Sequence, residues 1–216
     1  MDRILYWLRD TLISLPAVLI ALSFHEFAHG FVSWKLGDPT AKSLGRLTLN
    51  PIKHLDPIGF LCLTFFGFGW AKPVPVNARY YKNPRVGMAL TASAGPLMNL
   101  LLGFFGVAFY MLFFMIPMSS DFLISFRSVL LEMTVIFCNL NICLAIFNLI
   151  PIPPLDGSRI AFIFLPSKWY FGIMKYEQYI YIGLVLLMVL GAFDKTIGWL
   201  AMKILGGFFS FWDLIF

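Results

Sequence analysis

One apolar segment near the start of the chain carries ionisable side chains that a lipid-spanning helix rarely holds. Residues 11–34 make up 24 positions, and His25, Glu26 and His29 are their only readily ionised groups. A hydrophobic stretch of this length can cross the hydrocarbon core of a bilayer with some tilt. Each ionisable residue inside such a helix costs on the order of 2.5–3.5 kcal/mol on insertion scales. A cluster of three therefore predicts a functional site inside a membrane helix.

The composition of the whole chain also indicates a membrane protein. Its 216 residues are 60% hydrophobic and 12% charged, whereas a soluble domain is about half apolar and about a quarter charged. The excess apolar surface is expected to face lipid. Because the length suits one compact domain, we expect residues 1–216 to form a single membrane domain.

The net charge of +5 has a distribution that indicates topology rather than nucleic-acid binding. Eight of the 16 Lys and Arg residues fall between Lys35 and Arg85, where Asp38 and Asp56 are the only acidic residues. Short loops that are rich in Lys and Arg stay on the cytoplasmic side of a membrane. We therefore expect this loop to face the cytoplasm, and we expect no nucleic-acid partner.

Four further apolar segments complete the predicted architecture. They cover residues 86–116, 129–150, 179–193 and 197–212. The last of them has a helical stripe that either spans the membrane or lies in its interface. We therefore expect an all-α polytopic membrane protein with four to six transmembrane helices. Its core covers about residues 10–160, and its C-terminal helices cover residues 176–216.

The basic loop contains a shorter apolar piece, residues 58–71. It is too short to span the membrane and contains Gly59, Gly67 and Gly69, which do not favour a helix. Non-helical backbone survives at membrane depth only where protein or water satisfies its polar groups. We therefore expect a short membrane-associated β-hairpin or re-entrant loop. Residues 72–76 are expected to follow as an edge strand, since their two prolines exclude a central strand.

The run HEFAH, residues 25–29, has the spacing of a helical metal site. Residues four apart lie about 6 Å along a helix axis and nearly in line. Two imidazoles placed in this way can each approach one zinc ion at about 2.0–2.1 Å. Glu26 lies one residue further along, so its carboxylate can reach a water molecule that the metal activates and can act as a general base.

A third ligand is required, and the sequence offers His54, Asp56 and Asp156. Asp156 lies in the run NLIPIPPLDG, residues 148–157. Its three prolines exclude a continuous helix, and Gly157 permits a turn directly after the carboxylate. The run indicates a rigid arm that delivers one carboxylate. A solvated Asp at a helix end is the other interpretation, and by itself it is the commoner one.

These motifs together resemble those of the site-2 protease family of intramembrane zinc metalloproteases. HEFAH on the first long helix and NLIPIPPLDG after a later one carry the resemblance. Between them lie the similar runs WAKPVPVN at residues 70–77 and AGP at residues 94–96, the latter followed by Asn99. The resemblance covers about residues 10–160. It implies a minimal bacterial-type member, without an inserted PDZ module or a nucleotide-sensing domain.

The resemblance assigns roles to individual residues. It implies that His25, His29 and Asp156 bind one zinc ion per chain and that Glu26 activates water. Asn148 corresponds to a residue that helps to hold substrate or to stabilise the reacting carbonyl. The further candidates belong to the part of the chain that is similar to the family's substrate-pairing element: Gly67, Gly69, Val74 and Val76. The role of His54 stays open between a partner of the metal ligands, a gate and a residue of the loop surface.

The implied function is hydrolysis of peptide bonds within or near the transmembrane segments of membrane-protein substrates, as in regulated intramembrane proteolysis. The resemblance also implies an integral, multi-pass protein of a bacterial cell membrane, with its active site towards the cytoplasm. Its partners are then the lipid bilayer and a transmembrane substrate. A non-catalytic zinc-binding membrane scaffold or transporter is the alternative. A transporter built from inverted halves is disfavoured because the sequence shows no internal repeat.

Overall fold

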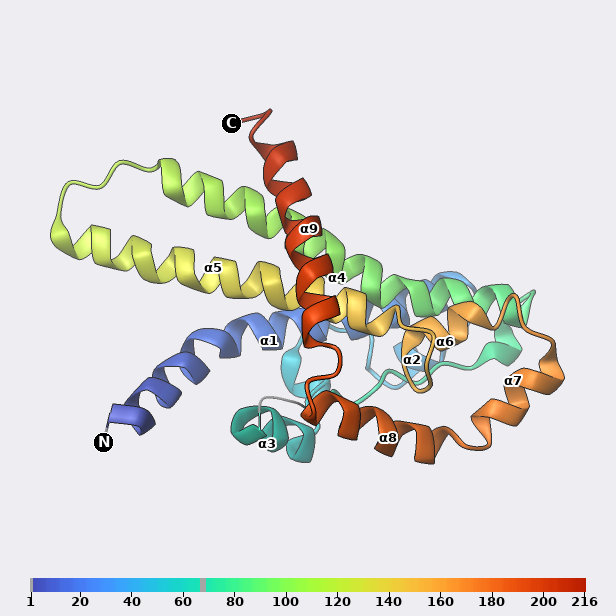
Figure 1. Ribbon diagram of the computed structural model, residues 1–216. Coiled ribbons are helices and arrows are strands. Elements are labelled where there is room, and N and C mark those ends of the chain that lie inside the picture. The colour runs from blue at the N-terminus through green and yellow to red at the C-terminus, as the bar shows by residue number, and fades with distance from the viewer. Residues whose placement is uncertain (1, 67–68) are drawn as a thin grey trace.

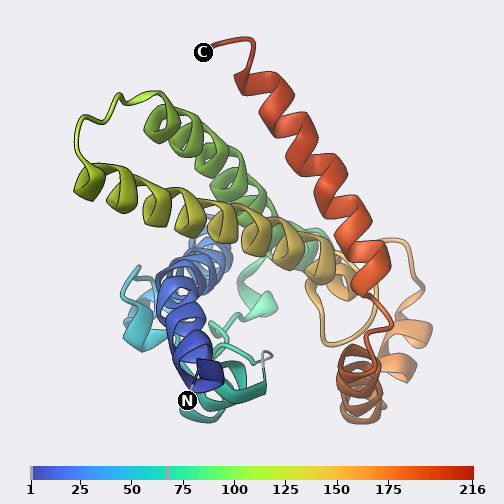
Figure 2. The same ribbon diagram turned by 60° about the vertical axis from the view of Figure 1, so that its left-hand side comes forward.

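Three long helices dominate the structure, which is a computed structural model that describes residues 2–66 and 69–216. They are α1 (Asp2–Lys35), α4 (Pro84–Met115) and α5 (Asp121–Asn148), and each is long and apolar enough to cross a membrane. In Figures 1 and 2, α4 and α5 form an antiparallel pair, and α1 packs against both. The prediction of an all-helical protein is confirmed for the described residues.

The remaining helices are short or lie towards the C-terminus. They are α2 (Thr40–Ser43), α3 (Pro57–Phe66), α6 (Asp156–Ala161), α7 (Ser167–Met174), α8 (Glu177–Val189) and α9 (Asp194–Trp212), with 3-10 turns η1 (Pro51–Lys53) and η2 (Ala78–Tyr80). The α8 and α9 helices together are apolar enough for one span, but they are bent by 77°. The described residues therefore offer three spanning helices, or up to four if this bent pair crosses the membrane, where we had expected four to six.

The first helix begins earlier than its apolar pattern suggests. It starts at Asp2 instead of residue 11, so its polar first turns are also helical. Within these turns, Arg9 donates a hydrogen bond of 2.5 Å to Glu132 of α5. The α5 helix also begins before its apolar run, at Asp121, where the Ser120 hydroxyl caps the helix by accepting a hydrogen bond from the Leu123 amide. Capping and charge pairs thus extend helices that hydropathy alone would shorten.

Small residues bring the long helices together, and large apolar side chains point outward. The buried face of α4 includes Gly95, Gly103 and Gly106, whereas Leu101 and Phe105 on the same helix are half exposed. The Cβ atom of a larger residue at Gly106 would lie 2.6 Å from Cys138 Sγ of α5. This distribution is the one that lipid favours, since helix association in a bilayer relies on close backbone approach.

The predicted β-hairpin within residues 58–71 is not found in the part of the chain that the structure describes. Residues 57–66 form α3, because Pro57 opens a helix and the Asp56 carboxylate accepts a hydrogen bond of 2.8 Å from the Gly59 amide. Gly67 lies outside the described residues. The chain nevertheless reverses its direction, since Leu55 and Ala71 form an isolated antiparallel bridge.

The edge strand predicted at residues 72–76 is an extended segment without a neighbouring strand in the described chain. Pro73 and Pro75 have no amide hydrogen to contribute to a sheet. Several polar groups of the segment bind other parts of the protein instead. The Lys72 amide donates to the His54 carbonyl, and the Arg46 guanidinium donates to the carbonyls of Lys72 and Pro73. We refer to residues 70–77 as the extended segment.

Candidate metal centre and cavity

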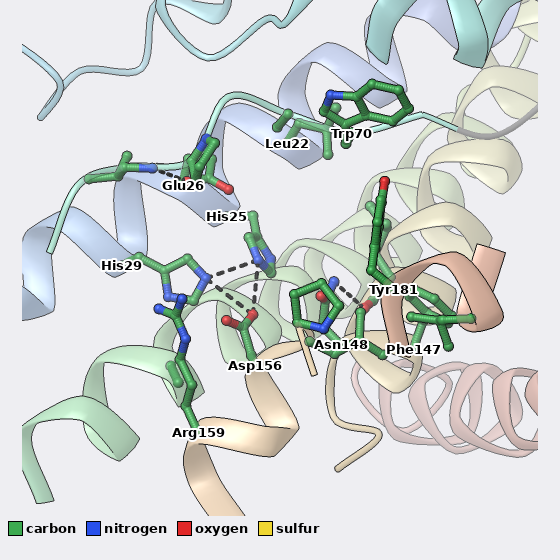
Figure 3. Close-up of a pocket in the computed structure, with 18 of the residues that line it drawn as sticks. Leu22, His25, Glu26, His29, Trp70, Phe147, Asn148, Asp156, Arg159 and Tyr181 are labelled. Carbon is green, nitrogen blue, oxygen red and sulfur yellow. Dashed lines mark hydrogen bonds and ion pairs between the residues drawn. The ribbon is translucent and has the colours of Figure 1, made fainter. Parts of the chain in front are cut away.

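Two histidines and one aspartate converge inside the helical core. The α1 helix presents His25 and His29 on one face, with 3.0 Å between their Nε2 atoms. Asp156, the first residue of α6, places its Oδ2 atom 3.2 Å from each of these nitrogens. Figure 3 shows the three side chains pointing towards one another from the two helices. The structure thus brings together the two ligands predicted on α1, His25 and His29, and the third ligand that the resemblance implied, Asp156.

The chemistry of this cluster fits a metal ion. The three donor atoms lie within 4.8 Å of one another, and both histidines are buried. The Asp156 Oδ2 atom is buried and accepts no hydrogen bond from the described residues. A buried carboxylate oxygen needs a strong partner, and two imidazoles with one carboxylate form a common catalytic zinc set that keeps a fourth position for water. The residues present therefore fit zinc.

The ring orientation of both histidines is fixed by hydrogen bonds at Nδ1. His25 Nδ1 lies 2.5 Å from Asn99 Oδ1, and His29 Nδ1 lies 2.7 Å from the Thr91 carbonyl. Asn99 in turn donates a hydrogen bond of 2.7 Å to Asn141 of α5. Since both Nδ1 partners are acceptors, each ring carries its proton on Nδ1 and directs the Nε2 lone pair at the cluster.

Thr91 and Asn141 belong to the hydrogen-bond network behind the two histidines, and the motifs of the sequence did not point to either of them. Asn141 is fully buried in an apolar helix, and an intramembrane polar residue of this kind is a signal that could have identified it. Thr91 acts through its backbone carbonyl, which any residue possesses. No sequence pattern marks such a contact.

Glu26 lies beside the cluster and is not one of its converging donors. Its Oε2 atom accepts a hydrogen bond of 2.7 Å from the Val74 amide of the extended segment. No group of the described residues bonds to the other carboxylate oxygen. The arrangement orients the side chain and leaves one oxygen able to accept a proton.

A cavity of about 310 Å³ adjoins these residues. Its lining includes the three converging side chains and Glu26, together with parts of the extended segment, α5 and α8. Figure 3 shows Trp70, Phe147 and Tyr181 around it. Of the sequence-predicted substrate residues, the following line the cavity: Gly69, Val74, Val76 and Asn148. The cavity thus joins the candidate catalytic residues to an extended piece of backbone.

His54 does not line this cavity and is not part of the converging cluster. It is 1% exposed, its Nε2 atom lies 2.7 Å from the Thr48 carbonyl, and its own carbonyl accepts from the Lys72 amide. The side chain therefore organises the loop that holds the extended segment. Asp56, another candidate for the third ligand, caps α3 instead.

Asp38 anchors the other end of the extended segment. It is fully buried, and its carboxylate accepts hydrogen bonds from the Asn77 amide at 2.7 Å, the Ser33 hydroxyl at 2.9 Å and the Thr40 amide at 2.9 Å. Burial acts to raise the pKa of Asp38, but these hydrogen bonds from Asn77, Thr40 and Ser33 outweigh it and hold the pKa below its ordinary value. Tyr81 continues the network by bridging the Ser33 hydroxyl to Thr91.

Comparison with known proteins gives one consistent result. Residues 124–190 match the family described as Peptidase family M50. The Bacillus subtilis (strain 168) protein named "Putative zinc metalloprotease YwhC" is 43% identical over 190 residues, which are 88% of this chain and 86% of that protein.

More distant relatives carry the same kind of name. Proteins named "Putative zinc metalloprotease Rip2" from Mycolicibacterium smegmatis and Mycobacterium tuberculosis (strain H37Rv) are 24% and 28% identical. The matches cover 82% and 84% of this chain, and 66% and 67% of those proteins. No solved structure gives a significant match.

Proposed function

This chain belongs to peptidase family M50, the membrane-embedded site-2 metalloproteases, and we propose that it hydrolyses peptide bonds within or near the transmembrane segments of membrane-protein substrates. The observation that carries the proposal is the convergence of His25, His29 and Asp156 at a cavity that also contains Glu26. One zinc ion per chain is expected to be bound by those three side chains.

Held by His25, His29 and Asp156, a zinc ion would supply Lewis acidity and would lower the pKa of water towards about 7. The protein supplies the remaining functions. Asn99 and the Thr91 carbonyl hold the two imidazoles in the tautomer that exposes Nε2. Glu26 accepts the proton of the attacking water through its free oxygen and returns a proton to the leaving amine.

The extended segment is suited to hold a substrate strand. A transmembrane helix must unwind before its peptide bonds become accessible, and the exposed backbone groups then need partners. The segment is anchored at both ends by Arg46 and Asp38, while Val74 and Val76 between them line the cavity. Asn148 also lines the cavity, and its amide donates to the Leu144 carbonyl. We expect its remaining hydrogen-bonding capacity to serve the reacting peptide.

We further propose that the active site lies towards the cytoplasmic face. His29 is six residues before the end of α1, about 9 Å along the helix. At this end, the ammonium groups of Lys35 and Lys42 lie 4.8 and 4.4 Å from the centroid of the Trp34 ring. A tryptophan with flanking lysines is typical of the cytoplasmic membrane interface.

Cleavage in a reconstituted membrane tests the proposed reaction. The purified chain is placed in liposomes with a panel of single-span proteins, and mass spectrometry locates each cut. We expect cuts within or near the span that stop when a zinc chelator is added and resume when zinc is restored. Cleavage confined to distant soluble loops contradicts the proposal. Zinc transfer across the sealed vesicles without any proteolysis would favour a transporter instead.

Gly95 provides a steric test of the metal centre. A Cβ atom at this position would lie 2.4 Å from His29 Nε2 and 2.6 Å from His25 Nε2, so Gly95→Ala must displace the two imidazoles. We expect zinc affinity to fall by roughly tenfold to a hundredfold, the range seen when ligand orientation is lost. Competition with a fluorescent zinc chelator measures the change.

The matched control for this substitution is Gly103→Ala on the same helix. Its added methyl group would meet the buried Ile142 side chain at 3.0 Å, a contact that a small shift relieves and that does not involve the metal ligands. We expect Gly103→Ala to bind zinc as the unmodified protein does. Equal zinc affinity of the two variants would contradict the position assigned to the histidine rings.

A further inference from the structure

Only one Lys or Arg residue is found among the described residues that line the cavity. Arg159 lies on α6, three residues after Asp156, so the two side chains project from the same side of this short helix. In Figure 3 the Arg159 side chain runs from α6 towards His29 and the converging ligands. It therefore approaches the candidate catalytic site and does not turn away into solvent.

The guanidinium of Arg159 has no anionic partner within the protein as described. It is half-buried, and none of the hydrogen bonds or ion pairs among the described residues involves it. The two carboxylates of the cavity are already engaged. Glu26 accepts from the Val74 amide, and Asp156 faces the two histidines. An arginine in this environment loses much of its hydration without gaining an internal counter-ion.

The charge balance of the cavity favours an anion. With a divalent cation in place, the formal charges are +2 for the metal, −1 each for Asp156 and Glu26, and +1 for Arg159, which leaves +1. Most of the other side chains that line the cavity are apolar, for example Leu22 and Leu144. A positive site in apolar surroundings attracts and orients an anionic ligand.

We propose that Arg159 is a specificity residue that binds a substrate carboxylate next to the scissile peptide bond. This inference rests on the proposed proteolytic function and adds a class of substrate to it. The planar guanidinium matches a carboxylate through two parallel hydrogen bonds. A peptide can present this group as an acidic side chain or as a free C-terminus, and both have the same binding chemistry.

A pair of small zinc-binding probes tests the inference without a known substrate. One probe is a short dicarboxylic acid monohydroxamate, and the other is the same molecule with its carboxylate converted to a carboxamide. Two, three and four methylene groups are compared. Isothermal titration calorimetry measures the affinity of each for the zinc-loaded full chain in detergent. We expect the carboxylate to bind about tenfold more tightly at the best length, as a charge-assisted pair allows.

Two variants isolate the contribution of Arg159. Arg159→Gln should remove the preference for the carboxylate while keeping the affinity for the carboxamide. Arg79→Gln is the matched control, because Arg79 is exposed and does not line the cavity. This substitution lowers the net charge by the same amount as Arg159→Gln. This control should keep the full preference. An equal preference in the unmodified chain and in Arg159→Gln would overturn the inference.

Other outcomes are also decisive. If Arg159→Gln weakens both probes equally, the guanidinium binds the hydroxamate oxygen and not a carboxylate, and the inference is wrong. If neither probe binds the unmodified chain, the metal centre itself is contradicted, and the inference falls with it. Tight binding of the carboxamide probe without any carboxylate preference leaves the metal centre intact and rejects the role of Arg159 alone.

The source of the carboxylate is resolved with isomeric probes. In one, the carboxylate ends the chain, as a substrate C-terminus would. In the other, the end is blocked as an amide, and the carboxylate sits on a branch, as an aspartate side chain would. The isomer whose affinity falls more in Arg159→Gln identifies the kind of substrate carboxylate that the residue binds.

Discussion

Replacing Glu26 with glutamine is expected to abolish peptide hydrolysis while leaving the metal centre intact. The amide has nearly the same shape as the carboxylate, and its oxygen can still accept the hydrogen bond from the Val74 amide. It cannot take a proton from water at neutral pH. Loss of a general base typically lowers a rate by roughly 10²- to 10⁴-fold. Zinc binding should be unchanged, because Glu26 is not one of the three converging donors.

Rate and zinc content are measured on the same preparations, with cleavage followed in liposomes. Glu132→Gln is the control, since Glu132 is partly exposed and pairs with Arg9 away from the cavity. It should retain near-normal activity. A Glu26→Gln protein that cleaves at the normal rate would remove Glu26 from the mechanism. One that loses zinc would show instead that the residue supports the metal centre.

Removing the Asp156 carboxylate is expected to cause the largest loss of metal binding. Its Oδ2 atom lies 3.2 Å from both histidine nitrogens and accepts no hydrogen bond from the described residues. Asp156→Ala leaves only two of the three protein ligands. We expect zinc affinity to fall by more than about a hundredfold, the upper end of the loss seen when a ligand's outer hydrogen-bond partner is removed.

The two other candidates for the third ligand provide matched controls. The sequence allowed His54 and Asp56 as well as Asp156 as the third ligand. In the structure, His54 and Asp56 have local roles instead. His54 bonds to the Thr48 carbonyl, and Asp56 caps α3. Both His54→Ala and Asp56→Ala are therefore expected to keep zinc, with any change confined to stability or substrate binding.

The long helices could be predicted because lipid leaves few alternatives. Apolar runs of adequate length predicted α4 and α5, and the spacing of HEFAH placed His25 and His29 on one face of α1. The approach of Asp156 depends on how two distant helices pack. Here the resemblance and the topology of the helices supplied what local periodicity could not.

The region between α1 and α4 was harder to predict. Glycines at residues 59, 67 and 69 suggested a β-hairpin, yet Pro57 and Asp56 begin a helix and Gly59 is tolerated within it. A Cβ atom on Gly59 would lie 2.2 Å from the Trp70 carbonyl oxygen. The glycine therefore serves close packing against the returning chain. A single sequence does not distinguish this use of glycine from a turn.

Contacts made through backbone atoms could not be predicted from the sequence. The Thr91 carbonyl orients His29, and the Val74 amide orients Glu26. Neither depends on the type of residue. Arg159 was also missed, because one arginine after an aspartate has no distinctive pattern until the fold turns it into the cavity. Such features emerge only when the packing of α5, α6 and the extended segment is known.

The three-ligand metal centre is tested by the zinc content of the purified chain beside Asp156→Ala and His54→Ala. Elemental analysis needs no knowledge of the substrate. We expect about one zinc ion per chain in the unmodified protein and in His54→Ala, and little or none in Asp156→Ala after dialysis. Full zinc content in Asp156→Ala would contradict the assigned ligand set. Absence of zinc from the unmodified protein, even after zinc is supplied, would contradict the metal centre itself.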